Sequence, residues 1–370
     1  MKNKCLRWLA LPLVLIATGM GAQEIAMPRL GRFYKPKENP ILRADSTFTF
    51  FCPVKKQTLR WQKADVFNPA AIVKDGKVFL LYRCEDNPAA ALGGRTSRIG
   101  LAESRDGIHF FKHPEPVLYP DNDAFQAQDY PGGCEDPRVV ETDDGRYILL
   151  YTSWNYQVPR LSVAVSTDLF HWEKKGLAFA KAHGGKFSGT HSKSASMITR
   201  FVGNKQVAAR IDGKYWMYWG EHFVNLAWSE NLSDWYPLLD EKGELKRLFS
   251  PRPGYFDSHL TECGPPAVFT DKGILLLYNG KNAEDASADP ALPKGVYSVG
   301  YALFDPANPE KVLARSETCF LKPTLPHERS GQYSAGTTFA EGLVFFKKKW
   351  MLYYGTADSF VGMAVVKGKR

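Results

Sequence analysis

Two adjacent carboxylates, Glu135 and Asp136, stand directly before an apolar run in the segment Gly-Gly-Cys-Glu-Asp-Pro-Arg-Val-Val. Neighbouring side chains of a strand point to opposite faces, so the two carboxylates cannot face one ligand if the strand has already begun. Pro137 lacks a backbone donor and suits the first position of a strand. We therefore expect Asp136 at the mouth of a strand. An isolated Asp-Pro would indicate only a turn, but a polar residue at the start of an apolar run recurs five times in the chain.

Polar side chains recur where other apolar runs begin and end. Those at the starts are Asn68, Asp136, Lys193, Glu262 and Ser334, and those at the ends are Arg83, Glu85, Asp86, Ser153, Trp154, Glu221, His222, Asn279, Lys281 and Asp358. Carboxylates, amides and cations that converge in a concavity suit the hydroxyl groups of a sugar. A rim of ordinary turn residues would also be polar, so the residues alone favour a sugar site only slightly.

Five aromatic-apolar runs show which elements position these side chains. They cover residues 78–82, 147–151, 215–219, 274–278 and 350–354. Each follows a turn, three of them Asp-Gly, which is a strong hairpin signal between apolar runs. Another predicted strand precedes each turn, and a third follows each run. The chain therefore reads as five repeated antiparallel units.

Units of ~60–70 residues with three or four antiparallel strands are typical of propeller blades. The last unit stops after its third strand, and residues 39–43 resemble residues 115–119, which close the first unit. We therefore predict an all-β fold: a five-bladed β-propeller in which the N-terminal segment completes the last blade. In such a fold the starts of the first strands and the ends of the second strands meet around one opening.

The N-terminus has the pattern of an export signal. Lys2, Lys4 and Arg7 precede an apolar run over residues 9–20, with small residues after it. That run is too short to span a bilayer of ~30 Å. We expect residues 1–22 to be a cleavable signal peptide, residues 23–370 to form one catalytic domain, and the mature protein to be periplasmic or secreted without a membrane span.

Composition excludes several other classes of function. The net charge of +9 falls to +6 without residues 1–22, and the remaining charges alternate in sign, so a nucleic-acid partner is not expected. No cysteine or histidine pair has zinc spacing and no loop has calcium spacing, so we expect no metal and no cofactor. The remaining five cysteines are expected to be buried structural thiols.

Several stretches resemble glycoside hydrolase family 130, the β-mannoside phosphorylases and hydrolases. They are Phe67-Asn-Pro-Ala-Ala71, Leu81-Tyr-Arg83, Ser97-Arg-Ile-Gly-Leu-Ala102, Glu135-Asp-Pro-Arg138, Gly264-Pro-Pro266 and Tyr354-Gly-Thr-Ala-Asp358. The resemblance implies a five-bladed propeller, a mannose-containing oligosaccharide as the ligand, and Asp136 as the general acid, acting through a sugar hydroxyl. It also implies a set of substrate-binding residues: Asn68, Arg83, Asp86, Arg98, Lys193 and Asp358.

The chain departs from the phosphorylases of this family at two positions. Where those enzymes have basic residues for phosphate, this chain has Glu221 after one strand and Glu262 before Gly264-Pro-Pro266. Two unit charges 4 Å apart at an effective dielectric of 20 repel by about 4 kcal/mol, so a glutamate pair should exclude phosphate. The same pair suits activation of water. The family's hydrolytic branch, which acts on β-1,2-mannosides, has such a pair.

We therefore predict an inverting β-mannosidase in which Asp136 protonates the leaving oxygen while Glu221 and Glu262 activate water. Either glutamate could be the base. One alternative is a β-mannoside phosphorylase, which would require phosphate. Another is a non-catalytic glycan-binding propeller, which would bind mannosides without releasing mannose. For either glutamate taken alone, a salt bridge in a loop is the simpler interpretation.

Overall fold

The computed structural model describes residues 32–90 and 94–367 and is built almost entirely of antiparallel strands. The predicted all-β class is confirmed. The predicted signal peptide lies outside the described residues. Within the described chain, none of the helices is long and apolar enough to cross a membrane.

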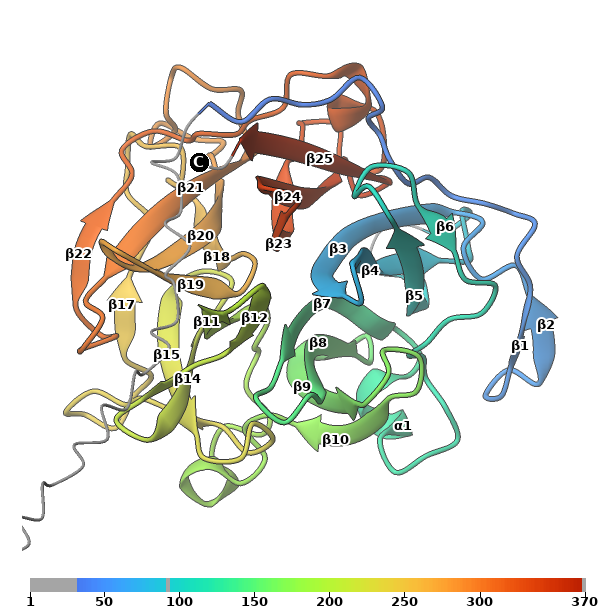
Figure 1. The fold of residues 1–370 in the computed structure, drawn as a ribbon, viewed down its shortest axis with the longest axis horizontal. Coiled ribbons are helices and arrows are strands. Elements are labelled where there is room, and N and C mark those ends of the chain that lie inside the picture. Colours follow the sequence, from blue (N-terminus) through green and yellow to red (C-terminus); the bar gives the residue numbers. More distant parts are fainter. Residues whose placement is uncertain (1–31, 91–93, 368–370) are drawn as a thin grey trace, which may run out of the picture.

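Five antiparallel groups follow one another around a common centre (Figure 1). The first two are β3 (Asp65–Lys74), β4 (Lys77–Glu85), β5 (Ser97–Ser104) and β6 (Phe111–Lys112), then β7 (Gly133–Glu141), β8 (Tyr147–Trp154), β9 (Arg160–Ser166) and β10 (Glu173–Leu177). The third contains β11 (Ala195–Val202), β12 (Lys205–Ala208), β13 (Arg210–Ile211), β14 (Lys214–Trp219), β15 (Val224–Ser229), β16 (Tyr236–Pro237) and β17 (Arg247–Phe249).

The fourth group contains β18 (Leu260–Cys263), β19 (Ala267–Thr270), β20 (Gly273–Lys281), β21 (Tyr297–Phe304) and β22 (Val312–Arg315), and the fifth contains β23 (Phe339–Phe346), β24 (Lys349–Thr356) and β25 (Phe360–Lys367). The five aromatic-apolar runs lie in β4, β8, β14, β20 and β24, as predicted. Parallel bridges join β5 to β7, β12 to β7 and β11 to β19, so strand pairing continues between some neighbouring groups.

Two-residue Asp-Gly turns form two of the hairpins. Asp75 and Gly76 have φ of 49° and 72°, and Asp212 and Gly213 have φ of 50° and 77°. A turn with both central residues at positive φ matches the twist of the flanking strands, which is why Asp-Gly predicts it. These turns fix the register of β3 with β4 and of β13 with β14.

The N-terminal segment pairs with the outer strand of the fifth group. Leu42 forms an antiparallel bridge with Val361, and Tyr34 forms one with Val365. The Asn39 side chain donates to the Met363 carbonyl at 2.8 Å and accepts from the Met363 amide at 2.9 Å. Residues 39–43 therefore add to β25, as their resemblance to residues 115–119 predicted. A separate hairpin, β1 (Phe50–Cys52) with β2 (Gln57–Leu59), follows.

The hydrophobic core lies between the faces of neighbouring groups. One cluster, for example, joins Leu81 and Ile99 of the first group to Val139 and Leu149 of the second. In the described chain the five cysteines are free, and all except Cys319 are buried, in agreement with structural thiols.

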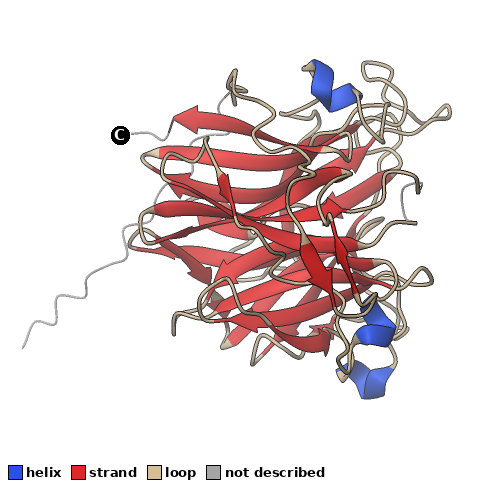
Figure 2. Cartoon of the chain, turned by 90° about the vertical axis from the view of Figure 1, so that its right-hand side faces the viewer, coloured by secondary structure: helices blue, strands red, loops and turns tan. Residues whose placement is uncertain are grey.

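In the part of the chain that the structure describes, the three short helices lie at the same end of the strands (Figure 2). They are α1 (Gln126–Asp129), η1 (Ala182–Gly185) and η2 (Pro326–Arg329). Each precedes the first strand of a group, namely β7, β11 and β23. The long connecting segments therefore gather at the end where the first strands begin.

Candidate active site

A cavity of about 300 Å³ opens where the first strands begin. It is lined by Phe67, Asn68, Arg83, Glu135, Asp136, Trp154, Pro159, His191, Lys193, Glu221, Glu262, Tyr297, Tyr333, Thr337, Phe339 and Asp358. Seven of the nine predicted site residues are among them, and they come from all five groups of strands. The structure therefore brings these side chains together as the repeat pattern predicted.

β-Bulges turn key side chains toward this cavity. The pairing of β3 with β4 skips Asn68, and the pairing of β7 with β8 skips Asp136 and Pro137. Asn68 and Asp136 have φ of 48° and 47°, in the left-handed region. Such a conformation costs of order 1–3 kcal/mol for a residue other than glycine and is concentrated at functional sites. The bulges explain how polar side chains project from otherwise apolar strands.

The bulge in β7 also corrects the expectation for Glu135. Strict alternation would send Glu135 and Asp136 to opposite faces, but both line the cavity because the bulge interrupts the alternation. The Arg83 guanidinium contacts both carboxylates, with Nη2 2.8 Å from Glu135 Oε1 and Nη1 3.2 Å from Asp136 Oδ1. Glu135 is therefore a site residue that the strand pattern missed.

Asp136 is buried among positive charges. Burial acts to raise the pKa of its carboxyl, but Arg83 and Lys193 together outweigh burial and hold the pKa well below its usual range. The Lys193 Nζ lies 3.5 Å from Asp136 Oδ2, and the Asn68 amide donates to Oδ1 at 2.8 Å. Burial raises the pKa of the neighbouring Glu135 to about 7, although Arg83 acts in the opposite direction. Without a ligand, Glu135 therefore holds a proton more readily than Asp136.

Glu221 and Glu262 line the same cavity, but the pKa values of their carboxyls differ widely. Burial and the nearby Glu221 raise the pKa of Glu262 to about 8. Burial also acts to raise the pKa of Glu221, but Lys193 and His191 outweigh it and bring the pKa to about 2. The His191 Nε2 lies 2.5 Å from Glu221 Oε2, and the Ser194 hydroxyl donates to Glu262. At neutral pH the pair therefore holds one proton and one negative charge.

Because Glu262 holds a proton in the folded protein, the free energy of unfolding should depend on pH. Its folded-state pKa of about 8 exceeds the usual 4.5, so between these values the folded protein keeps a proton that the unfolded chain has lost. The contribution of this group to stability therefore falls as the pH rises from about 4.5 through 8. Glu262→Gln does not titrate, so its melting temperature should gain several degrees relative to wild type between about pH 5 and pH 9.

The matched control is Glu241→Gln, at an exposed position. Its melting temperature relative to wild type should stay constant over the same pH range. A constant difference for Glu262→Gln as well would contradict a proton held on Glu262.

Asp86 and Arg98 do not line the cavity, contrary to expectation. Arg98 is fully buried, and its Nη1 lies 3.0 Å from Asp86 Oδ2, which also lies 3.6 Å from Lys55. These side chains form an ion-paired cluster beside the site. Arg98 lies on β5, and Asp86 directly follows β4. Both are therefore close to Arg83, which does line the cavity, and they resemble ligand-binding residues for that reason.

The aromatic lining of the cavity was only partly predictable. Trp154, at a position that the sequence singled out, ends β8, and His191 lies in the loop before β11. Tyr297, Tyr333 and Phe339 carried no such signal. Tyr333 lies in the segment between η2 and β23, which follows no repeat.

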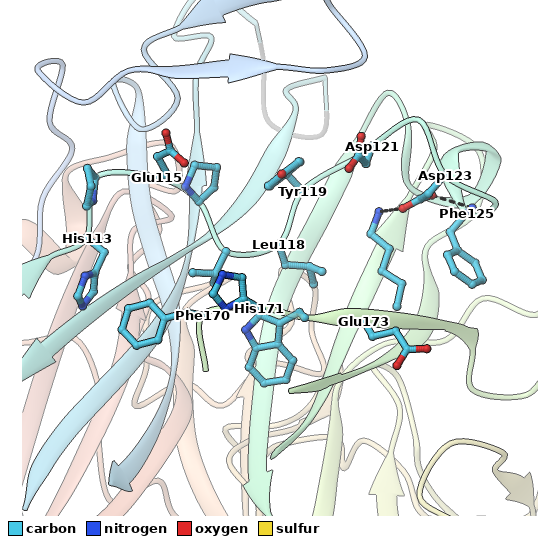
Figure 3. Close-up of a pocket in the computed structure, with 15 residues that line it drawn as sticks. His113, Glu115, Leu118, Tyr119, Asp121, Asp123, Phe125, Phe170, His171 and Glu173 are labelled. Atoms are coloured by element: carbon cyan, nitrogen blue, oxygen red, sulfur yellow. Dashed lines mark hydrogen bonds and ion pairs between the residues drawn. The ribbon is translucent and has the colours of Figure 1, made fainter. Parts of the chain in front are cut away.

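A larger groove of about 920 Å³ lies on the outer side, between residues 113–125 and residues 170–174 (Figure 3). Aromatic and acidic side chains line it, and the Lys174 Nζ in it contacts Asp123 at 2.9 Å and the buried Asp129 at 2.6 Å. None of the predicted site residues lines this groove. The candidate active site is therefore the smaller cavity.

Comparison with known proteins decides the family. The profile of glycoside hydrolase family 130, described as beta-1,4-mannooligosaccharide phosphorylase, matches residues 34–369. The chain belongs to family 130. It is 32% identical over 314 residues to a 1,2-beta-oligomannan phosphorylase of Thermoanaerobacter sp. (strain X514), a match that covers 84% of this chain and 92% of that protein.

Solved structures of similar proteins share the fold. A putative glycosidase from Bacteroides thetaiotaomicron VPI-5482 is 54% identical, with a TM-score of 0.91 over 92% of this chain and 98% of the other. A second structure, reported among the family 130 glycoside hydrolases that target beta-1,2 mannosidic linkages in Candida mannan, is 48% identical, with a TM-score of 0.91 over 94% and 98%. A beta-1,2-mannobiose phosphorylase from Listeria innocua is 22% identical, with a TM-score of 0.69 over 90% and 96%, and shows the shared fold alone.

Proposed function

We propose that this family 130 enzyme hydrolyses β-mannosidic bonds, with β-1,2-mannosides as its substrates, and inverts the configuration at the anomeric carbon. The observation that carries the proposal is the glutamate pair, Glu221 and Glu262, in the cavity that also holds Asp136. The similar structure reported with hydrolases that target beta-1,2 linkages supports the substrate. Asn68, Arg83, Lys193 and Asp358 would bind the hydroxyl groups of the sugar.

The charge of the cavity opposes phosphate. In the described chain, the lysine and arginine side chains that line it are Lys193 and Arg83, and both already contact carboxylates. An entering phosphate would therefore find no unpaired lysine or arginine, and it would be repelled by the ionised Glu221. Repulsion of about 4 kcal/mol between unit charges 4 Å apart is enough to abolish useful binding.

The protonation states of the carboxyls in the cavity indicate which group acts as base and which as acid. Glu221, ionised at neutral pH, accepts a proton from water, and the protonated Glu262 beside it donates a hydrogen bond to the same water. Asp136 supplies the proton to the leaving oxygen through a sugar hydroxyl. Because Asp136 is ionised in the free enzyme, a proton must reach it when substrate binds, and Glu135 shares the same Arg83. Inversion requires acid and base carboxyls about 6.5–9.5 Å apart.

Phosphate dependence tests this function. We expect mannose release from β-1,2-mannobiose at the same rate with and without inorganic phosphate, with α-mannose as the first product by NMR. The similarity to a 1,2-beta-oligomannan phosphorylase favours the rival reaction. Formation of mannose 1-phosphate, or loss of activity without phosphate, would establish that rival. Binding of mannosides without any release of mannose would establish a non-catalytic propeller.

The proposal also includes the setting of this chemistry. We interpret the five groups of strands as the blades of one propeller domain over residues 23–370, closed by the N-terminal segment at β25. The N-terminal sequence pattern supports export through a signal peptide at residues 1–22. An exported hydrolase releases free mannose, whereas an exported phosphorylase would leave its sugar phosphate outside the cell.

A further inference from the structure

A buried arginine lies beneath the cavity and belongs to neither the predicted acid nor the predicted base. Arg138 is in β7, directly after the bulge that carries Asp136, and it is 1% exposed. Its Cζ lies 5.9 Å from the centre of the Phe339 ring, and Phe339 lines the cavity. Arg138 therefore packs against Phe339 in the cavity wall and does not line the cavity itself.

All three nitrogens of the Arg138 side chain donate to backbone carbonyls. Nη1 donates to the Asp136 carbonyl at 2.8 Å, Nη2 to the Cys263 carbonyl at 3.0 Å, and Nε to the Gly264 carbonyl at 3.4 Å. The first carbonyl belongs to the predicted acid, and the second belongs to the residue that follows Glu262. One guanidinium thus connects the backbone next to both sides of the proposed reaction, across more than 120 residues of sequence.

The carboxyl of Glu341 contacts the same guanidinium. Its Oε1 lies 2.9 Å from Arg138 Nη1, and its side chain is fully buried. Within the described chain, neither oxygen of Glu341 has a hydrogen-bond donor, so its contact with Arg138 lacks hydrogen-bond geometry. Glu341 is the residue skipped in the pairing of β23 with β24, just as Asp136 is skipped in β7. Burial raises the pKa of Glu341 well above its usual range, although Arg138 acts in the opposite direction. A buried carboxyl without a hydrogen bond of its own costs folding free energy, and its close contact is with the Arg138 guanidinium.

We propose that Arg138, oriented by Glu341, is a positioning residue that holds the strand of the acid, β7, and the strand of Glu262, β18, at a fixed separation. This inference rests on the proposed hydrolysis. Glu262 holds the water that Glu221 deprotonates, so the separation of β7 and β18 sets the distance from the acid to that water, and a displacement of about 1 Å can cost about 100-fold in rate. The left-handed backbone at Asp136 leaves its carbonyl available, and Arg138 is the group that binds it.

Lysine cannot reproduce this arrangement. A guanidinium presents a rigid planar set of donors, whereas an ammonium is a single flexible point charge. Arg138→Lys should therefore keep the charge near Asp136 but lose the fixed connection to β18. We expect kcat on β-1,2-mannobiose to fall about 100-fold while KM stays within about threefold, because the sugar-binding side chains are unchanged.

The matched control is Arg315→Lys in β22. Arg315 is also a largely buried arginine that contacts a carboxylate, Asp257 at 2.5 Å, and a backbone carbonyl, Ser250 at 2.7 Å, but it does not line the cavity. We expect Arg315→Lys to lower the melting temperature about as much as Arg138→Lys while leaving kcat within about threefold of wild type. Equal losses of kcat in the two variants would overturn the positioning role.

Two further variants keep the inference testable if Arg138→Lys does not fold. Glu341→Ala removes the carboxyl that lies against the Arg138 guanidinium and should lower kcat about tenfold with KM unchanged. Arg138→Met removes a positive charge that lowers the pKa of Asp136, so the limb of the pH profile that reports Asp136 should move to higher pH. An unmoved profile together with unchanged kcat in Glu341→Ala would overturn the proposal. Phosphate-independent hydrolysis by wild type tests the proposed function separately.

Discussion

Replacement of Asp136 by asparagine is expected to lower kcat on β-1,2-mannobiose by about 10²–10⁴-fold, the range for loss of a general acid. The asparagine still accepts the hydrogen bond from Asn68, but it cannot deliver a proton to the leaving oxygen. KM should change little, because the other sugar-binding side chains of the cavity remain. Steady-state kinetics with the natural disaccharide gives both parameters.

The leaving group separates loss of acid catalysis from loss of folding. An aryl β-mannoside with an activated leaving group departs without protonation, so Asp136→Asn should retain most of the wild-type rate on it. The control is Asp143→Asn, at an exposed aspartate in the turn after β7, which should match wild type on both substrates. If Asp136→Asn is equally impaired on both substrates, Asp136 is not the acid.

The fold was predictable because its signals are local and repeated. Aromatic-apolar runs that each follow a turn, three of them Asp-Gly, defined β4, β8, β14, β20 and β24. The resemblance of residues 39–43 to residues 115–119 located the pairing of the N-terminal segment with β25. Each inference needed only the period of the side chains and the turn chemistry, not knowledge of long-range packing.

The site was predictable where strand ends converge and unpredictable where the backbone departs from regularity. Glu135 was not predicted to share the cavity with Asp136, because the alternation of side chains does not predict the bulge that follows Glu135. Only the pairing of β7 with β8 shows this bulge. Asp86 lies close to Arg83 in the sequence and Arg98 lies close to it in the strand pairing, but neither lines the cavity. Arg98 pairs with Cys84, one register position away from the pair of Arg83 with Ile99. Arg138 and Glu341 escaped notice because their contact depends on the meeting of distant groups of strands.

The charges of the cavity explain why three of its carboxyls have raised pKa values. Glu135, Asp136, Glu221, Glu262 and Asp358 surround Arg83 and Lys193, so acidic groups outnumber the cations that line the cavity. Burial raises the pKa of Asp358 to about 6, of Glu135 to about 7 and of Glu262 to about 8, although Arg83 or Lys193 opposes each shift. Asp136, which contacts both Arg83 and Lys193, and Glu221, which contacts His191, remain ionised. This uneven division provides both an ionised base and stored protons within one small cavity.

Replacement of Glu221 by glutamine is expected to lower hydrolysis by about 10²–10⁴-fold, because Glu221 is the ionised member of the pair and the proposed base. The loss should appear in kcat, with KM within a few-fold of wild type. Glu262→Gln should cost less, since its carboxyl is already protonated at neutral pH and glutamine can still donate a hydrogen bond. Steady-state kinetics of the two variants at one pH distinguishes base from partner.

Rescue by a small anion locates the position of the attacking water. Glu221→Ala removes both the charge and the volume of the base, so azide can occupy the space, attack the anomeric carbon directly and need no proton acceptor. We expect azide to restore turnover of an activated aryl β-mannoside in Glu221→Ala and to give the α-mannosyl azide, the product of a single inversion. Wild type should form no azide adduct, because the ionised Glu221 repels the anion just as it repels phosphate. A β-configured adduct would instead require two successive displacements and would rule out the inverting mechanism.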